Sequence, residues 1–209
     1  IALRGLKGAT WFVDSGVSGG ASGNGLSWGG ALLTLAEAVA KALADDTILV
    51  AAGHAEAAIT TAITFAVAGV SVYGYGRGER RPKLTFTGDV DVNLNASGIT
   101  LSNLVFQSGV DGQTIIIDVN AANCTIEDCA FYEGSSIQWV TAVDINGGAA
   151  NACDNTVIAR CRFQSIAAGA TQAIEIGEIA DGVIIEDCYI DGDITNAGIH
   201  NPTGFVATN

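Results

Sequence analysis

The sequence predicts an all-β chain folded as a parallel β-helix, a solenoid of stacked coils with one capping α-helix near its N-terminus. Three observations support this fold: a motif that recurs four times, a second short motif between its copies, and helix-forming residues concentrated in one early segment. Internal repeats with periods of this length are typical of solenoids, in which each unit packs only on its neighbours.

The main motif is eight residues long, with core-type residues at its first, third, sixth and eighth positions. Its copies begin at Ile99, Cys124, Thr156 and Val183, at intervals of 25, 32 and 27 residues. Alternation at spacing two predicts short strands, and the two-residue interruption in the middle predicts a tight turn. The sixth positions are expected to form an inward ladder of Leu104, Cys129, Cys161 and Cys188.

A second alternating motif lies between these copies. It comprises 92–95, 116–120, 142–146 and 173–177. Each period therefore carries about three short strands, which would stack on like strands of the next coil about 4.8 Å away. A propeller blade needs four strands and a longer repeat. An α/β sheet needs a helix in each crossover, whereas only one helix is predicted.

The N-terminal region is expected to form the cap. A strand is predicted over 9–15, a Gly/Ser loop over 16–30 and a helix over 31–44. The predicted apolar face of this helix consists of Leu32, Leu35, Ala36, Val39 and Leu43. We therefore divide the chain into an arm, strand and capping helix (1–45) and the coils (46–209). No polar cap follows the last coil, so we expect the natural protein to continue or a partner to cover that end.

The charge and hydrophobicity of the chain restrict the kinds of partner that it can bind. The chain has 22 acidic and 9 basic residues and a net charge of −13, which argues against nucleic acid and against anionic membrane surfaces. No apolar run reaches the roughly 18 residues of a membrane span, so no membrane partner is expected. The five cysteines could form disulfides or a metal site. Three of them share one inward position, however, so we prefer buried packing and predict no metal at them.

Two columns of carboxylates are the candidate catalytic groups. Asp128 and Asp187 share one turn position, with Arg160 between them, and we interpret this column as a charge ladder on the surface. The second column, Asp118, Asp144 and Glu175, would stack like charges. Such a stack raises pKa values or binds a cation, which makes it the better place for Ca²⁺. We expect no other cofactor, and all five carboxylates are weak catalytic candidates.

Two further features depart from the repeat. Four of the nine basic residues fall within seven positions, at Arg77, Arg80, Arg81 and Lys83. They could contact an acidic partner or simply form a solvated loop. Trp139 lies in the longest insertion and could contact a glycan or partner, or fill a local gap. Together with the N-terminal arm 1–8, these are the candidate interaction residues.

The segments WFVDSGVSGGASGNGLSW and LLTLAEAVAKALADDTILVAAGHAE resemble the N-terminal module of the pectate-lyase-like right-handed β-helix superfamily. In this chain Asp45 replaces the glycine that usually precedes Asp46. Within the superfamily, 67–86 and the C-terminal segment 189–209 are most similar to phage virion proteins. The resemblance indicates fold more strongly than activity, because this fold serves lyases, hydrolases, adhesins and virion proteins.

From this resemblance we expect a non-enzymatic phage virion protein, a capsid decoration or cement or a tail-appendage subunit. It would assemble in the host cytoplasm with other virion proteins or with copies of itself, for example as a trimer. The alternatives are a polysaccharide lyase or hydrolase of the tailspike depolymerase type, with a glycan as partner, or a bacterial surface adhesin module, either of which would be secreted or at a cell surface.

Overall fold

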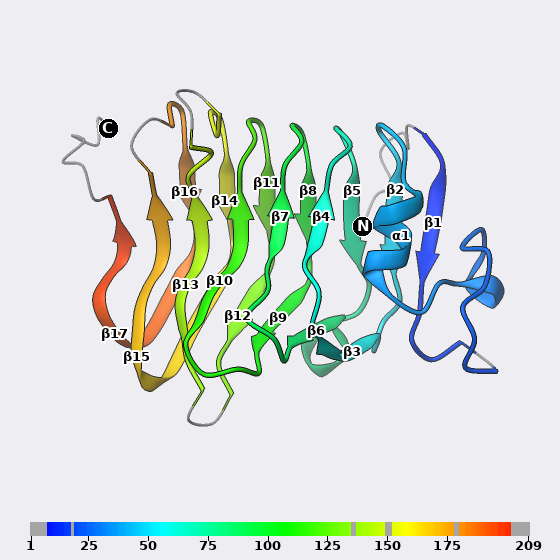
Figure 1. Ribbon diagram of the computed structural model, residues 1–209, viewed down its shortest axis with the longest axis horizontal. Helices are drawn as coiled ribbons and strands as arrows, with labels where there is room; N and C mark the ends of the chain where they lie inside the picture. Colours follow the sequence, from blue (N-terminus) through cyan, green and yellow to red (C-terminus); the bar gives the residue numbers. More distant parts are fainter. Residues whose placement is uncertain (1–7, 18, 135–136, 149–151, 178–179, 202–209) are drawn as a thin grey trace.

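The computed structural model describes residues 8–17, 19–134, 137–148, 152–177 and 180–201. Its strands form two parallel sheets wound into a β-solenoid, which confirms the predicted fold class (Figure 1). Sheet A has the spatial order β1 (Thr10–Val13), β2 (Thr47–Val50), β5 (Ser71–Gly74), β8 (Thr100–Ser102), β11 (Thr125–Glu127), β14 (Val157–Ala159) and β16 (Ile184–Glu186).

Sheet B covers the other two sides of each coil and bends between them. Its strands are β3 (Ala55–Ile59), β4 (Ile63–Phe65), β6 (Lys83–Phe86), β7 (Val92–Leu94), β9 (Val105–Ser108), β10 (Gln113–Val119), β12 (Ala130–Tyr132), β13 (Trp139–Ile145), β15 (Arg162–Ile176) and β17 (Tyr189–His200). The long strand β15 pairs with β12 in its first half and with β13 in its second, so it joins both sides of the sheet.

The four copies of the main motif form the predicted strand–turn–strand units. In each copy the second residue of the interruption has a positive φ: 57° at Asn103, 53° at Asp128, 52° at Arg160 and 51° at Asp187. Asn and Asp tolerate this left-handed conformation better than other non-glycine residues. The same logic explains Asp45, whose φ of 63° accounts for the glycine usually found at that position.

The core consists of inward ladders along the solenoid. The rings of Phe106, Phe131 and Phe163 stack with centroid distances of 5.2 and 4.6 Å. Leu104, Cys129 and Cys161 are almost fully buried, and Cys188 in the last coil is half-buried. All five cysteines are free. The neighbouring Cys129 thiol, together with burial, raises the pKa of Cys161, as expected for inert packing residues.

The predicted helix is shorter than expected. It spans Leu35–Lys41 (α1), because Leu32 bridges to Val13 and Thr34 begins the helix with a capping box to Glu37. The predicted apolar face is partly wrong: Ala36 and Leu43 are exposed, whereas Ala38 and Ala42 are buried. The helix packs against β1, β2 and β4 at the N-terminal end of the solenoid (Figure 1).

Two short 3-10 turns, Trp28–Gly30 (η1) and Gly78–Arg80 (η2), complete the regular structure. β1 pairs in parallel with β2, so the segment before residue 46 supplies a strand of sheet A as well as the cap. The buried carboxylate of Asp46 holds this segment by accepting hydrogen bonds from Ala9 N, Trp11 Nε1 and Leu43 N. Burial alone would raise the pKa of Asp46, but these hydrogen bonds outweigh it and lower that pKa. No helix in the described part of the chain is long and apolar enough to cross a membrane.

Candidate functional site

A groove of about 860 Å³ runs along the outside of sheet B, across β3, β6, β9, β12 and β15. Its floor and walls are mostly polar, with cations near one end. The lining residues are Gly53, His54, Ala55, Gly78, Glu79, Arg81, Lys83, Val105, Gln107, Tyr132, Glu133, Gln164 and Ile166.

Strand register places the floor residues side by side. Gln107, Tyr132 and Gln164 are partners on three successive strands. Each directly follows a buried phenylalanine of the core stack, so strand alternation turns it to the outer face. The groove floor is therefore a consequence of the same repeat that builds the core.

Arg81 places a guanidinium at the edge of this groove, where no described residue gives it an anionic partner. Its Nη2 donates to the carbonyl oxygens of Leu104, at 2.9 Å, and of Asp128, and its Nε is buried without a hydrogen-bond partner among the described residues. Neither Arg81 nor the exposed Lys83 forms an ion pair within the described ranges. The groove therefore offers two positive charges to an anionic ligand.

Glu133 is the buried carboxylate of the groove, and it is engaged in structural contacts. It accepts hydrogen bonds from Ser165 Oγ at 2.9 Å, Ile166 N at 2.8 Å and Trp139 N at 3.4 Å. These contacts join β15 and β13 to the residue that follows β12. Glu133 therefore stabilises the wall of the groove near β15 and is not available as a base.

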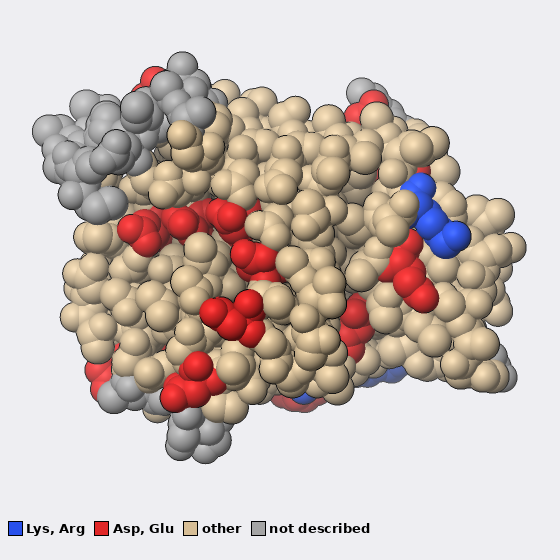
Figure 2. All heavy atoms as spheres, in the orientation of Figure 1, with Lys and Arg blue, Asp and Glu red and all other residues tan. Residues whose placement is uncertain are grey.

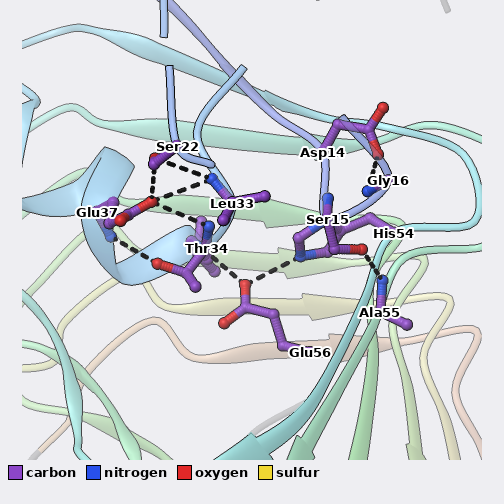
Figure 3. A network of polar contacts seen from close by, with 11 residues as sticks. Asp14, Ser15, Gly16, Ser22, Leu33, Thr34, Glu37, His54, Ala55 and Glu56 are labelled. Carbon is purple, nitrogen blue, oxygen red and sulfur yellow. Dashed lines mark hydrogen bonds and ion pairs between the residues drawn. The ribbon is translucent and has the colours of Figure 1, made fainter. Parts of the chain in front are cut away.

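His54 lies at the same end of the groove as Lys83, within a buried network shown in Figure 3. Its Nδ1 accepts from Ser15 N at 2.9 Å, so the proton lies on Nε2, which is 2.9 Å from Glu56 Oε1. Glu56 Oε1 also accepts from Leu35 N at 2.6 Å, at the start of α1. The His54 side chain is 0% exposed, so it holds the segment around Ser15 against the first coil rather than facing solvent.

Replacing His54 by glutamine should therefore destabilise the cap. One of the two ring contacts would be lost, leaving a buried polar group unsatisfied at a cost of about 2 kcal/mol. Urea unfolding followed by circular dichroism measures this change. His200→Gln is the matched control, because its side chain is 30% exposed. Equal midpoints for the two variants would contradict a stabilising role for the contacts of His54 with Ser15 and Glu56.

The carboxylates Asp118, Asp144 and Glu175 come together as predicted. They lie on the side of the solenoid formed by β10, β13 and the second half of β15, whereas the groove lies on the side formed by β3, β6, β9, β12 and the first half of β15. Asp144 pairs in register with both Asp118 and Glu175. Figure 2 shows acidic side chains running across the face that carries β10, β13 and β15. Burial, followed by the charges of Glu175 and Asp118, raises the pKa of Asp144 to about 7. Burial also raises the pKa of Asp118, although Asn120 donates a hydrogen bond to it at 2.7 Å.

Calcium at this column stays a prediction. In the ranges that the structure describes, no group of three or more His, Cys, Asp or Glu residues is arranged to hold a metal ion. His200 Nδ1 lies 3.8 Å from Glu175 Oε1 and extends the column to the last strand.

The other predicted carboxylates lie in turns outside the groove. Arg160 bridges Glu127 at 2.7 Å and Asp128 at 3.0 Å, all three being partly or fully exposed. This is the surface charge ladder that the sequence favoured. Asp187 occupies the same turn position one coil further on and is exposed.

The structure separates the predicted interaction residues. Arg81 and Lys83 line the groove, whereas Arg77 and Arg80 are exposed on the loop beside it. Trp139 is 0% exposed and belongs to the core, so its assignment as a surface contact is corrected in favour of the local plug. Of the N-terminal arm, residues 1–7 lie outside the described residues.

Sequence reasoning missed the groove floor. Gln107, Tyr132 and Gln164 each stand one position after the eight-residue motif, so they form a further outward column that alternation alone could have revealed. No comparable sequence signal marks Glu133, because its partners lie on distant strands.

The fold defines the structural class of this chain, the parallel β-solenoids. Among solved structures it is similar to a chain described as rhamnogalacturonan lyase, with a TM-score of 0.58 and 13% sequence identity. The match covers 92% of this chain and 63% of that one, so the present chain spans less than two thirds of that protein. At this identity the likeness shows the fold alone. No protein-family model matches the chain. No curated protein matches it either.

Proposed function

We propose that this chain binds and cleaves an acidic polysaccharide in the groove over sheet B. The observation that carries the proposal is Arg81, a guanidinium at the edge of a polar groove that is fixed by two backbone carbonyls and has no counter-ion among the described residues. A half-buried cation without a partner is costly unless a ligand supplies the negative charge. Uronic-acid carboxylates along a glycan would supply it.

The reaction that fits these groups is β-elimination. Arg81 would neutralise the uronate carboxylate, which makes the adjacent C5 proton more acidic. Lys83, in its neutral amine form, would accept that proton as the base. The C4–O glycosidic bond then breaks, a C4=C5 double bond forms, and the leaving oxygen takes up a proton from the Lys83 ammonium or from water. Similarity of fold to a chain named as a lyase supports this reaction over a purely structural role.

Lys83→Gln should test this proposal without disturbing the fold, because the Lys83 side chain is exposed. We expect release of unsaturated products from rhamnogalacturonan or polygalacturonate to fall at least about a hundredfold, as is typical for loss of a general base. Arg81→Ala should weaken glycan binding about tenfold, equivalent to one charge-assisted hydrogen bond.

Arg80→Ala is the matched control, since it removes a neighbouring cation that does not line the groove. Product is followed by the ultraviolet absorbance of the new double bond. If Lys83→Gln and Arg80→Ala were equally active, Lys83 would not be the base. If wild-type protein neither bound nor cleaved any acidic glycan, the proposed function would be wrong.

The virion role, the adhesin role and their locations stay predictions. None of the contacts in the groove bears on them. Assembly with other copies of this chain or with a larger particle is likewise untested by these contacts.

A further inference from the structure

We infer that Arg162 and Tyr189 form a second sugar-binding subsite that continues the groove toward the C-terminal coil. This inference rests on the proposed function and adds the residues that would set the length of glycan recognised. It is drawn from strand register, exposure and one cation–π contact.

The register places Arg162 directly along the solenoid from Lys83. Lys83 pairs with Val105, Val105 with Ala130, Ala130 with Arg162, and Arg162 with Tyr189. With strands about 4.8 Å apart, Lys83 and Arg162 lie roughly 14 Å from each other. Arg162 also stands two residues before the floor residue Gln164 on β15, so both side chains lie on the same face.

Tyr189 gives this position its stacking surface. The guanidinium carbon of Arg162 lies 5.4 Å from the centre of the Tyr189 ring, within the range of a cation–π contact. Tyr189 is nevertheless 56% exposed. It is also the only aromatic residue of the column Lys83, Val105, Ala130, Arg162 and Tyr189.

Such a pair suits an acidic sugar. An aromatic ring offers an apolar face to the C–H groups of a pyranose, and its contact with Arg162 holds both side chains in place before binding. Among the described residues Arg162 has no ion-pair partner, so its guanidinium is free to receive a carboxylate. Arg81 and Lys83 would then hold one end of an extended acidic oligosaccharide and Arg162 with Tyr189 the other.

The test is calorimetric titration with a size series of oligogalacturonates, from the disaccharide to the octasaccharide. Arg162→Ala and Tyr189→Ala should each weaken octasaccharide binding about tenfold and leave disaccharide binding unchanged. Lys83→Gln should weaken binding of both lengths. The controls are Arg160→Ala, which removes an exposed arginine from a nearby turn, and Tyr73→Ala, which removes a tyrosine from sheet A.

The outcomes separate this inference from the proposed function. If Lys83→Gln weakened binding while Arg162→Ala and Tyr189→Ala bound the octasaccharide like wild type, the subsite would be overturned and the groove retained. If no oligogalacturonate bound to wild type, both would fall. If the two variants lost affinity only for a polyglutamate peptide, the surface would bind an acidic polypeptide, and the assignment to a glycan would be wrong.

Discussion

Replacing Phe131 by alanine should cost about 3–5 kcal/mol of the free energy of unfolding, the usual range for a buried phenylalanine. Its ring is 0% exposed and lies in the middle of the phenylalanine stack, 5.2 Å from Phe106 and 4.6 Å from Phe163. In a solenoid each coil is stabilised by its two neighbours. A cavity at Phe131 therefore weakens two coil interfaces together.

Urea unfolding followed by circular dichroism and tryptophan fluorescence would measure this loss. Leu43→Ala serves as the control for an apolar truncation, because Leu43 is 70% exposed and should change stability by less than about 0.5 kcal/mol. Phe131→Leu should fall between the two, since it keeps part of the buried surface. A loss below about 1 kcal/mol for Phe131→Ala would show that the stack is not a main support of the coils.

The repeat made most of the fold predictable. In each coil the interior accepts only a few residue types at fixed positions, so Phe106, Phe131 and Phe163 recur in register and reveal the core directly. The turn is equally visible, since a tight change of direction needs a left-handed residue and Asn103, Asp128 and Asp187 are suited to it. The carboxylate column followed from the same alignment.

The features that the sequence did not predict depend on contacts between segments that lie outside the repeat. Trp139 lies in an insertion, and only the neighbouring coils decide whether it points inward. His54 becomes a clamp because Ser15 and Leu35, distant in sequence, present backbone groups to it and to Glu56. The ends of α1 are likewise set by a bridge from Leu32 to the first strand. The floor of the groove follows from the repeat, whereas its ends depend on such local departures, as at His54 and Glu133.

Asp144 is a carboxylate whose charged form the folded protein disfavours near neutral pH. Its register neighbours are Asp118 and Glu175, and one of its carboxylate oxygens is buried without a hydrogen-bond partner among the described residues. Burial is the first cause of the rise of its pKa to about 7, and the two like charges add to it. Gln172 Nε2 donates a hydrogen bond to Glu175, which is the register neighbour of Asp144.

This shift makes stability depend on pH in a definite direction. The folded pKa lies above that of the unfolded chain, so between about pH 4 and pH 7 the folded protein binds more protons from Asp144 than the unfolded one. The contribution of Asp144 is therefore favourable below about pH 4 and is lost as the pH rises to about 7. A shift of this size corresponds to at most ~4 kcal/mol, which solvent screening of a partly exposed group reduces to about 2 kcal/mol.

Asp144→Asn should remove this penalty, because asparagine is neutral at every pH and its amide can donate to the neighbouring carboxylates. We expect the variant to be more stable than wild type by about 2 kcal/mol at pH 8 and no more stable at pH 4. Urea midpoints measured across this range would show it. Asp187→Asn is the matched control, since it removes the same charge from an exposed turn whose φ of 51° asparagine also tolerates.

An equal gain from Asp187→Asn would assign the effect to the net charge of −13 rather than to the stacked column. An unchanged pH profile in Asp144→Asn would contradict the raised pKa. Because the column faces away from the groove, the same variant should keep the glycan affinity of wild type. A large loss of cleavage in a stabilised Asp144→Asn protein would instead place the acid of a hydrolase at this column, and Lys83 would then no longer be needed as the base.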